Sequence, residues 1–446
     1  MHRATVALAA AACAFAATPA RADGGAGHAE ETETGVLRRE VAELRREVAE
    51  LRAARTPESD ANALHAAVDA YLAHRPAATG GSYVGPGGVL RPGGGVTLGG
   101  YFSTRYVSAQ AGGNPTFADM RLVPQIHADI TDRIAFNTEI EWEHGGVSDE
   151  HGGEVAVEYA ELSFRWSDAF KFKAGTLLVP FGAFNQSHDD PINEMSSRPT
   201  VDRFVVPSAF SIPGIGAEGA VELSDEASLT YDVVLTNGFK DEITPEKGLR
   251  TARGLFDEDD NHDKTVFGRI GVVPTVSFLD ALHVGASGAF GKIGAQSDPL
   301  RGFGVDAAAK SGPWEFKGEY DAFGIGRPAG SPPPLDAAGN LGPVRGLHGW
   351  YAQVLYRFTD PWVRSLPFAE DDASFALVLR RDMVDLNDRV HGASPQDDER
   401  AWSFGVTYRP TAKTAIKIEF RKASSGAPGD LGEDRDLFAV EFATYF

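Results

Sequence analysis

The sequence has a single cysteine, Cys13, and it lies near the N-terminus. The surrounding stretch has basic residues at its start, an apolar run, and the small-x-small motif ARA at 20–22, so we expect residues 1–22 to be a signal peptide removed on export. A lipoprotein acylated at Cys13 is the alternative, but residues 10–12 are all alanine and lack the bulky residue that such sites usually carry. The exported chain would then have neither a disulfide framework nor a cysteine metal site.

Positive charge and long apolar runs are also scarce. The chain has 42 Lys and Arg against 63 Asp and Glu, a net charge of −21, which argues against nucleic acid as a partner. Beyond the signal peptide no stretch reaches the ~18 unbroken apolar residues of a membrane helix. A membrane β-barrel remains open, because its strands alternate lipid-facing and lumen-facing residues and give only a weak hydropathy signal.

The N-terminal part of the chain predicts a helix on a linker. Residues 23–35 are small and acidic, which is typical of a disordered leader. The heptad REVAELR occurs at 39–45 and again at 46–52, with valine at a and leucine at d of a short coiled coil. Two heptads are marginal alone, so a tethered oligomer would have to hold the coil together; a solvated single helix is the alternative. We assign 36–75 to this helical segment and the glycine-rich 76–95 to a linker.

From residue 96 onward the hydrophobic period changes to two. In RIAFNTEIEWEH one side is apolar and the other carries Asn and Glu, the alternation of a half-exposed strand. The 50 glycines and the 44 aromatic residues, which are 27 Phe, 11 Tyr and 6 Trp, suit many short strands. Sixteen strands are predicted, at 96–108, 117–131, 133–144, 154–166, 169–179, 215–224, 227–237, 264–275, 280–292, 301–310, 313–324, 346–358, 372–383, 399–410, 413–424 and 435–446.

The predicted connections alternate in length. After even-numbered strands they shrink to one or two residues in most cases, as at 167–168, with 276–279 and 359–371 as longer exceptions. After odd-numbered strands they are longer and polar or rich in Pro and Gly, up to 180–214. Tight turns at one end and long loops at the other are typical of outer-membrane barrels. We therefore predict an all-β fold, a 16-stranded antiparallel transmembrane β-barrel over 96–446, preceded by the short N-terminal coiled-coil helix.

Two strands carry specific expectations. In the strand at 154–166 the apolar residues change face midway, with Val155, Val157 and Tyr159 on one side and Leu162, Phe164 and Trp166 on the other, and a β-bulge would reconcile them. The last strand is expected to pair with the first, which leaves the sheet without an edge. Phe438, Phe442 and Phe446 would then face lipid or its interface.

Sixteen strands leave an aqueous channel unless it is plugged, so we expect a porin that passes small hydrophilic solutes or ions through the outer membrane. The loop at 180–214 is the longest, and long loops without secondary structure are usually functional. In porins this loop typically folds into the bore and narrows it; an extracellular lid is the alternative. The candidate constriction residues are His188, Asp189, Asp190, Glu194, Arg198, Asp202 and Arg203.

Charged residues of both signs are predicted to face the lumen. Basic rings favour anions and acidic rings favour cations, and neither sign is in excess. A basic wall would form if Arg409, Lys417 and Arg421 face Arg105 and Arg121 across the closing strand. The candidate pore-wall residues are Arg105, Arg121, Glu139, Glu141, Glu143, Glu315, Lys317, Glu319, Asp321, Arg357, Arg409, Lys417 and Arg421.

The order of exported leader, short coiled coil, glycine linker and 16-stranded barrel, together with KAGTLLVPFG at 173–182, resembles the family of phosphate-selective porins O and P. The resemblance implies a trimeric channel of the Gram-negative outer membrane whose anion selectivity rests on arginines and lysines lining the bore. It also places the N-terminal helix in the periplasm.

Other chemistry has weaker support. DEDDNHD at 257–263 lacks the glycine and distal glutamate of an EF-hand, and a solvated acidic loop explains it as well. His144 and His151, with Glu150 between them, are a weak zinc candidate. The contiguous Ser-His-Asp at 187–189 is a poor triad, and no G-x-S-x-G occurs. We predict no catalytic residue, metal or cofactor; a barrel-embedded hydrolase and a structural or adhesive barrel with a periplasmic partner are the alternatives.

Overall fold

The computed structural model describes eleven stretches of the chain, all within the unit Ala61–Phe446. The predicted signal peptide, leader and coiled coil lie outside the described residues, as do most of the linker and the start of the acidic 257–263 motif. Among the described residues no helix is long and apolar enough to cross a membrane. The described residues are 95–109, 114–144, 153–224, 226–243, 248–254, 256, 262–294, 296–327, 344–386, 398–425 and 436–446.

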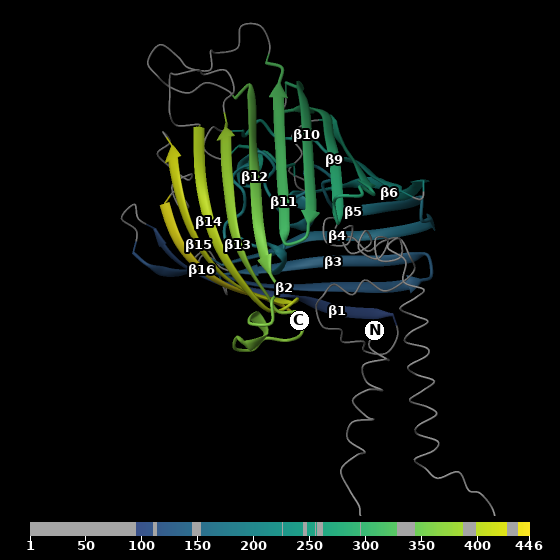
Figure 1. Ribbon diagram of the computed structural model, residues 1–446. Helices are drawn as coiled ribbons and strands as arrows, with labels where there is room; N and C mark the ends of the chain where they lie inside the picture. Colours follow the sequence, from purple (N-terminus) through teal and green to yellow (C-terminus); the bar gives the residue numbers. More distant parts are fainter. Residues whose placement is uncertain are drawn as a thin grey trace, which may run out of the picture. The chain divides into compact units, whose positions relative to one another are not determined.

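Sixteen antiparallel strands form one closed barrel, as predicted (Figure 1). Each strand pairs with its neighbours in the chain. The strands are β1 Val96–Ala109, β2 Thr116–Thr131, β3 Ile134–Glu143, β4 Glu154–Ser167, β5 Phe170–Leu178, β6 Ser211–Ser224, β7 Ala227–Asn237, β8 Lys264–Pro274, β9 Ala281–Ile293, β10 Asp298–Ser311, β11 Trp314–Ile325, β12 Gly346–Phe358, β13 Ser374–Asp385, β14 Asp398–Thr411, β15 Thr414–Ser425 and β16 Asp436–Tyr445.

The closure that the sequence predicts is confirmed. β1 pairs with β16 from Tyr101 opposite Tyr445 to Ala109 opposite Leu437. The terminal Phe446 adds a backbone hydrogen bond, its N–H donating to the carbonyl of Gly100 at 2.9 Å. No edge is left between the first and last strands, so the backbone groups that would invite another chain are satisfied within the sheet.

The two faces of the barrel reverse the usual burial of polar and apolar residues. In β15, Lys417 is 1% exposed and Glu419 is fully buried. Phe420, which lies between Glu419 and Arg421, is 52% exposed. The same holds at the C-terminus, where Phe442 and Phe446 are both exposed. Charged side chains therefore face the inside of the barrel and apolar ones face outward.

The bulge predicted in β4 is confirmed, and Glu158 is its extra residue. Val157 lies opposite Ile140 of β3, but the next pair joins Tyr159 to Glu139, so Glu158 has no partner in the register. Val155 and Trp166, at the two ends of β4, are both exposed on the outer face. The bulge thus keeps Val155 and Val157 outward on one side of it and Phe164 and Trp166 outward on the other, and it aims an additional carboxylate inward. Tyr159 was predicted to share a face with Val155 and Val157, but it lies opposite the inward Glu139 and faces the inside of the barrel.

Strand boundaries lie within two residues of the predicted ones except at the starts of β6 and β10, and β10 begins at Asp298 rather than at 301. For β6 the sequence predicted residue 215 as the first, whereas the strand begins at Ser211. Pro213 lies within the strand, opposite Thr176 of β5, and proline normally argues against a strand. The β5–β6 connection is therefore 179–210, and it contains two 3-10 turns, η2 Asn185–Ser187 and η3 Asp190–Ile192, and one helical turn, α4 Val201–Phe204.

Most of the other connections follow the predicted alternation. The β9–β10 connection, 294–297, was predicted to be long but is shorter than 275–280 between β8 and β9. Connections after even-numbered strands are short, apart from the β8–β9 connection and 359–373 between β12 and β13, which carries the 3-10 turn η6 Val363–Ser365. The long β7–β8 connection carries η4 Leu249–Thr251.

Deleting Glu158 tests the bulge. Because this residue has no partner in the register, its removal lets its neighbours pair with β3 as in a regular strand, and we expect the barrel to fold. The measurement is gel mobility in sodium dodecyl sulfate without heating, where a folded barrel migrates differently from the heated chain.

Deletion of Glu419 is the matched control. It is also a buried inward glutamate, but β15 pairs without interruption on both sides of it. Its removal turns one half of β15 inside out, since the side-chain period of a strand is two, and we expect the folded species to be lost. Equal behaviour of the two deletions would contradict the assignment of the bulge.

Candidate functional site

The β5–β6 connection lies inside the barrel. This segment, residues 179–210, is called the inner loop below. It makes hydrogen bonds to β1 through Ser103, to β4 through Glu158, to β11 through Glu319 and to β15 through Glu419. A single short segment can touch strands all round a closed sheet only from within it.

Apolar packing holds the inner loop against the β8–β13 side of the wall. Phe181 lies 4.7 Å from Phe323 between ring centroids, and Phe210 packs edge-on to Phe267 at 5.6 Å. Val201 of α4 is fully buried in the same cluster. Burial of aromatic rings supplies much of the free energy that positions a loop, because each removes a large apolar surface from water.

Charged contacts also hold the inner loop to the wall. Glu194 of the inner loop accepts from Arg357 Nη2 at 2.8 Å and from Arg409 Nε at 3.0 Å. Burial opposes ionisation of this carboxyl, but the two guanidiniums outweigh it and hold the pKa of Glu194 below its usual range. Arg409 also donates to the backbone carbonyl of Pro191 at 2.6 Å. Two wall arginines thus converge on one loop carboxylate.

A second charged contact joins the loop to the closing strands. Lys417 Nζ donates to the carbonyl of Asp190 at 2.5 Å and to Glu441 Oε1 at 2.7 Å. The carboxylate of Asp190 accepts from Ser103 Oγ at 2.6 Å and lies 3.7 Å from Arg121. Burial opposes its charge, but Arg121 and Lys417 hold the pKa of Asp190 below its usual value.

A third contact centres on Ser197. Its backbone N–H and hydroxyl both donate to Glu419, at 2.7 and 2.6 Å. Arg380, which is 1% exposed, donates to the Ser197 carbonyl at 2.9 Å and to Asp382 Oδ2 at 2.9 Å. Thr200 of the loop accepts from Arg421 Nη2 at 3.0 Å. Two inner-wall strands, β13 and β15, therefore hold the same few loop residues.

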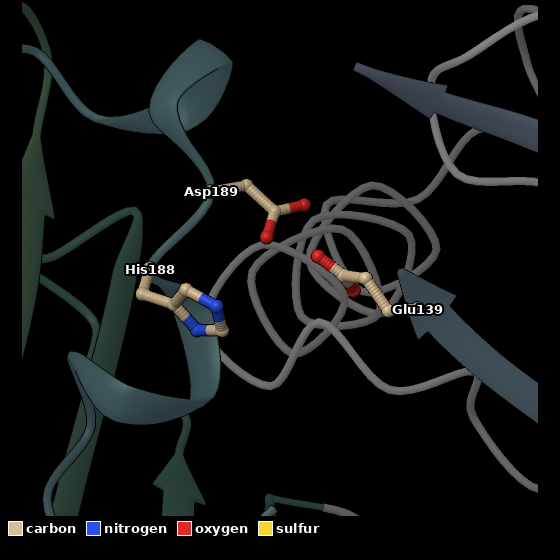
Figure 2. A group of neighbouring side chains, drawn as sticks. All are labelled: Glu139, His188 and Asp189. Atoms are coloured by element: carbon tan, nitrogen blue, oxygen red, sulfur yellow. The ribbon is translucent and has the colours of Figure 1, made fainter. Parts of the chain in front are cut away.

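Glu139, His188 and Asp189 form a polar cluster at the start of the loop (Figure 2). One potential ligand atom from each lies within 4.8 Å of the others, and Figure 2 shows the carboxylates of Glu139 and Asp189 facing one another. Asp189 accepts from Tyr445 at 2.9 Å, and Glu139 accepts from the Gln125 amide at 3.1 Å. Hydrogen-bond donors from the wall thus reach both carboxylates.

His188 is held as a cation in this cluster. Its Nδ1 lies 2.9 Å from the Asn185 carbonyl, which requires a proton there, and its Nε2 lies 3.3 Å from Glu158 Oε2. Burial of the ring lowers its pKa, but attraction to Glu158 and the hydrogen bond between them outweigh burial, so the pKa of His188 is raised. The bulge residue of β4 is therefore the counter-ion of the loop histidine.

The remaining predicted loop residues have different surroundings. Arg198 donates to the Ser208 carbonyl, and the guanidinium of Arg203 lies 5.4 Å from the Phe204 ring centroid. Asp202 is fully buried, and neither of its carboxylate oxygens has a hydrogen-bond partner. It lies close to Glu319 and Asp321 of β11.

The predicted wall arginines and lysines are mixed with acids. The register places Glu441 between Arg105 and Lys417 across the closing strands, so the wall there carries both signs. Ion pairs join Arg105 to Asp119, Arg121 to Glu141 and Glu143, Arg357 to Glu315, Lys417 to Glu441, and Arg421 to Glu399. Lys317, which is half-buried, lines a small cavity beneath the inner loop with Arg380.

Several charged wall residues were not among the predicted ones. Lys173 is fully buried and lies 2.8 Å from both Glu218 and Asp232. Arg380 lies in a predicted strand, and the period of two would have separated it from the outward Arg381, whose guanidinium lies 5.0 Å from the Trp402 ring centroid. Others missed are Glu158, Arg269, His283, Asp306, Asp382, Glu399, Glu419 and Glu441.

The weaker chemical candidates find other partners. Ser187 Oγ donates to the Ala183 carbonyl at 3.1 Å, whereas His188 pairs with Glu158, so the 187–189 sequence is not arranged as a triad. His144 lies 3.1 Å from Asp119, and residues 150 and 151 lie outside the described residues. Asp263, the last residue of the acidic motif, pairs with Lys292 at 2.9 Å.

Comparison with known proteins places the fold among outer-membrane barrels. Salmonella typhi OmpF, solved in complex with daunomycin, aligns with 80% of this chain and 100% of its own at a TM-score of 0.53 and 11% identity. The outer membrane channel DcaP of Acinetobacter baumannii aligns with 81% of this chain and 100% of its own, at a TM-score of 0.45 and 12% identity. The anion-selective porin from Comamonas acidovorans aligns with 79% of this chain and 99% of its own, also at a TM-score of 0.45 and 12% identity. The likeness to OmpF is one of fold.

At the level of sequence, no family model matches the chain. An uncharacterized protein of Aquifex aeolicus (strain VF5) is 26% identical over 347 residues, which is 73% of this chain and 75% of that protein. The class of protein that fold and interior define is thus a 16-stranded barrel with a charged inner wall and an internal loop.

The pKa of His188 generates a prediction about stability. Because the folded-state pKa is raised above the unfolded value of about 6.5, the His188–Glu158 pair stabilises the fold fully below that value, and the contribution is lost as pH rises through the folded pKa. We expect His188→Gln to lower the free energy of unfolding by about 2 kcal/mol near pH 6. The deficit should shrink at higher pH.

Urea unfolding in detergent from pH 6 to pH 9 measures the deficit. Glu158→Gln is the matched variant, since it removes the partner and leaves the ring. Both variants should show the same loss of deficit with pH. A deficit in His188→Gln that stays constant over this range would contradict a charged histidine.

Proposed function

We propose that this protein is a porin of the bacterial outer membrane that lets small hydrophilic solutes or ions diffuse passively through the barrel. The observation that carries the proposal is the inverted burial of the sheet, with charges inside and apolar side chains outside, in a closed barrel of sixteen strands. Barrels of that strand number leave an aqueous channel, and an apolar outer band suits lipid. The resemblance to trimeric porins supports a homo-oligomer with its N-terminal helix in the periplasm.

Partly exposed charges on the inner wall support a water-filled lumen. The side chains of Arg121 and Glu141 are 20% and 13% exposed, and those of Lys171 and Glu161 are 17% and 11% exposed, although all four face the inside of a closed sheet. Solvent-accessible space therefore remains beside the inner loop. We propose that this loop narrows the bore and that its charged residues, with the wall residues opposite them, form the constriction.

Selectivity follows from the sum of these charges. Phosphate or general anion selectivity, which the family resemblance implies, would need basic side chains that act on the permeating ion. In the described wall Arg121, Arg357, Arg409 and Arg421 are each in contact with carboxylates, which lowers the positive potential that an anion would meet. We propose a general diffusion channel with modest ion selectivity. Phosphate is one of the solutes that this channel would pass.

Planar bilayers test the channel. We expect purified protein to produce open-channel current steps, because a wet lumen conducts ions. A hydrolase with a filled barrel or an adhesive barrel would be silent, and a silent bilayer in which folded insertion is demonstrated would contradict the porin proposal.

Charge reversal on the inner wall should change ion selectivity. In Arg409→Glu and Arg421→Glu a wall cation is replaced by an acid next to Glu194 or Glu399. We expect the cation-to-anion permeability ratio, measured from the reversal potential in a salt gradient, to rise roughly twofold or more.

Arg364→Glu is the control, because this exposed arginine lies in the β12–β13 connection rather than on the inner wall. It should leave the reversal potential near the wild-type value. Unchanged selectivity in both wall variants would count against these residues lining the conducting path.

A further inference from the structure

We propose that Asp202, Glu319 and Asp321 form a binding site for Ca²⁺ that fastens the inner loop to the barrel wall. Asp202 comes from α4 of the inner loop, and the other two come from successive inward positions of β11. One carboxylate oxygen of each lies within 4.8 Å of the others. Ligands on opposite sides of a Ca²⁺ ion are about 4.6 to 5.2 Å apart, so the spacing fits its oxygen coordination.

The three carboxylates are buried with little to neutralise them. Asp202 and Asp321 are fully buried and Glu319 is 3% exposed. Both oxygens of each aspartate and Oε1 of Glu319 have no hydrogen-bond partner. Unpaired buried carboxylates are costly in free energy unless a cation or a proton joins them. Five carboxylate oxygens of the three residues thus lack a hydrogen-bond donor.

Nearby arginines do not fill this role. Arg380 donates to Asp382 and to Ser197, and Arg198 donates to the Ser208 carbonyl. Asp202 instead has the carboxylates of Glu319 and Asp321 beside it. The local charge therefore favours the arrival of a positive ion.

A glycine lets the inner loop approach the oxygens closely. Gly182 of the inner loop has a φ of +73°, and a Cβ there would collide with Glu319 Oε1 and lie 3.6 Å from Asp321 Oδ2. The N–H groups of Ala183 and Phe184 donate to the other Glu319 oxygen, at 2.8 and 2.9 Å. One oxygen of Glu319 is thus held by the loop, while the other is turned toward the two aspartates.

An all-oxygen, carboxylate-rich set favours a hard cation such as Ca²⁺ over zinc or copper, which prefer nitrogen and sulfur ligands. Buried apolar residues lie beside the site, since Phe181 and Asp321 both lie close to Gly304 of β10 and Phe323 packs on Phe181. A bound cation there would connect α4 to β11 and would fix the loop by a charge that the chain itself does not supply.

Isothermal titration of the full chain with CaCl₂ tests the site. The protein is refolded from denaturant into detergent without lipopolysaccharide and treated with EDTA. We expect saturable binding of one Ca²⁺ per chain, with a dissociation constant between about 10⁻⁷ and 10⁻⁴ M, and a higher thermal midpoint with Ca²⁺ than with EDTA. Absence of saturable Ca²⁺ binding would overturn the proposal, because it would mean that protons on the carboxylates neutralise them instead of a cation.

Asp321→Asn is the test variant, and Asp202→Asn is a second in case the first does not fold. Each should weaken Ca²⁺ binding roughly tenfold or more and abolish the Ca²⁺-dependent rise in thermal midpoint. In EDTA each should be at least as stable as the wild type, because one of three mutually repelling charges is removed. A merely structural role would instead destabilise the variant in both conditions.

Glu441→Gln is the matched control, since Glu441 is another buried inward carboxylate but already pairs with Lys417. It should keep Ca²⁺ binding at the wild-type strength. Equal loss in this control would overturn the assignment of the three ligands. The binding readout does not depend on conduction, so its failure would leave the porin proposal standing, and a silent channel would leave the Ca²⁺ site standing.

Discussion

Closure of the sheet is the constraint on which the rest of this structure depends. In hydrocarbon no water replaces a lost backbone hydrogen bond, so a sheet in a membrane must have no edge. Here the pairing of β1 with β16 meets that requirement. Closure also separates the two faces of every strand, and the sequence can then place Lys417 and Glu419 inside while Phe420 faces out. The bulge at Glu158 preserves this separation where the alternation of β4 is interrupted.

An enclosed charged wall dictates how the inner loop is held. Buried ions are tolerated only when they are paired and hydrogen-bonded, and the loop and wall supply each other's partners. Glu194 meets two arginines from β12 and β14, and Lys417 meets a loop carbonyl as well as Glu441. Apolar contacts such as Phe181 with Phe323 position the loop as well. The wall therefore specifies the position of the loop by both charge and shape.

The sequence predicted the strands well because a barrel strand is defined by its local alternation. The closing pair and the bulge in β4 followed from the same period of two. The start of β6 was missed, since Pro213 normally argues against a strand. Contacts of the loop could not be predicted, because partners such as Ser197 and Glu419 lie 222 residues apart. The sequence did not identify Glu158 as a site residue, because the alternation with period two does not predict which face an extra residue in a bulge takes.

The charges of the inner loop explain why the Asp202 cluster stands apart. Asp190 is balanced by Arg121 and Lys417, and Glu194 by Arg357 and Arg409. His188 brings its own charge to Glu158. At Asp202 the wall presents further carboxylates instead of a base, although arginines are plentiful on neighbouring strands. A barrel whose interior is open to an aqueous solution does not need to encode every counter-charge in its own sequence, because dissolved cations can supply the missing one. The proposed channel and the proposed Ca²⁺ site are thus both consistent with the water-filled interior that we propose.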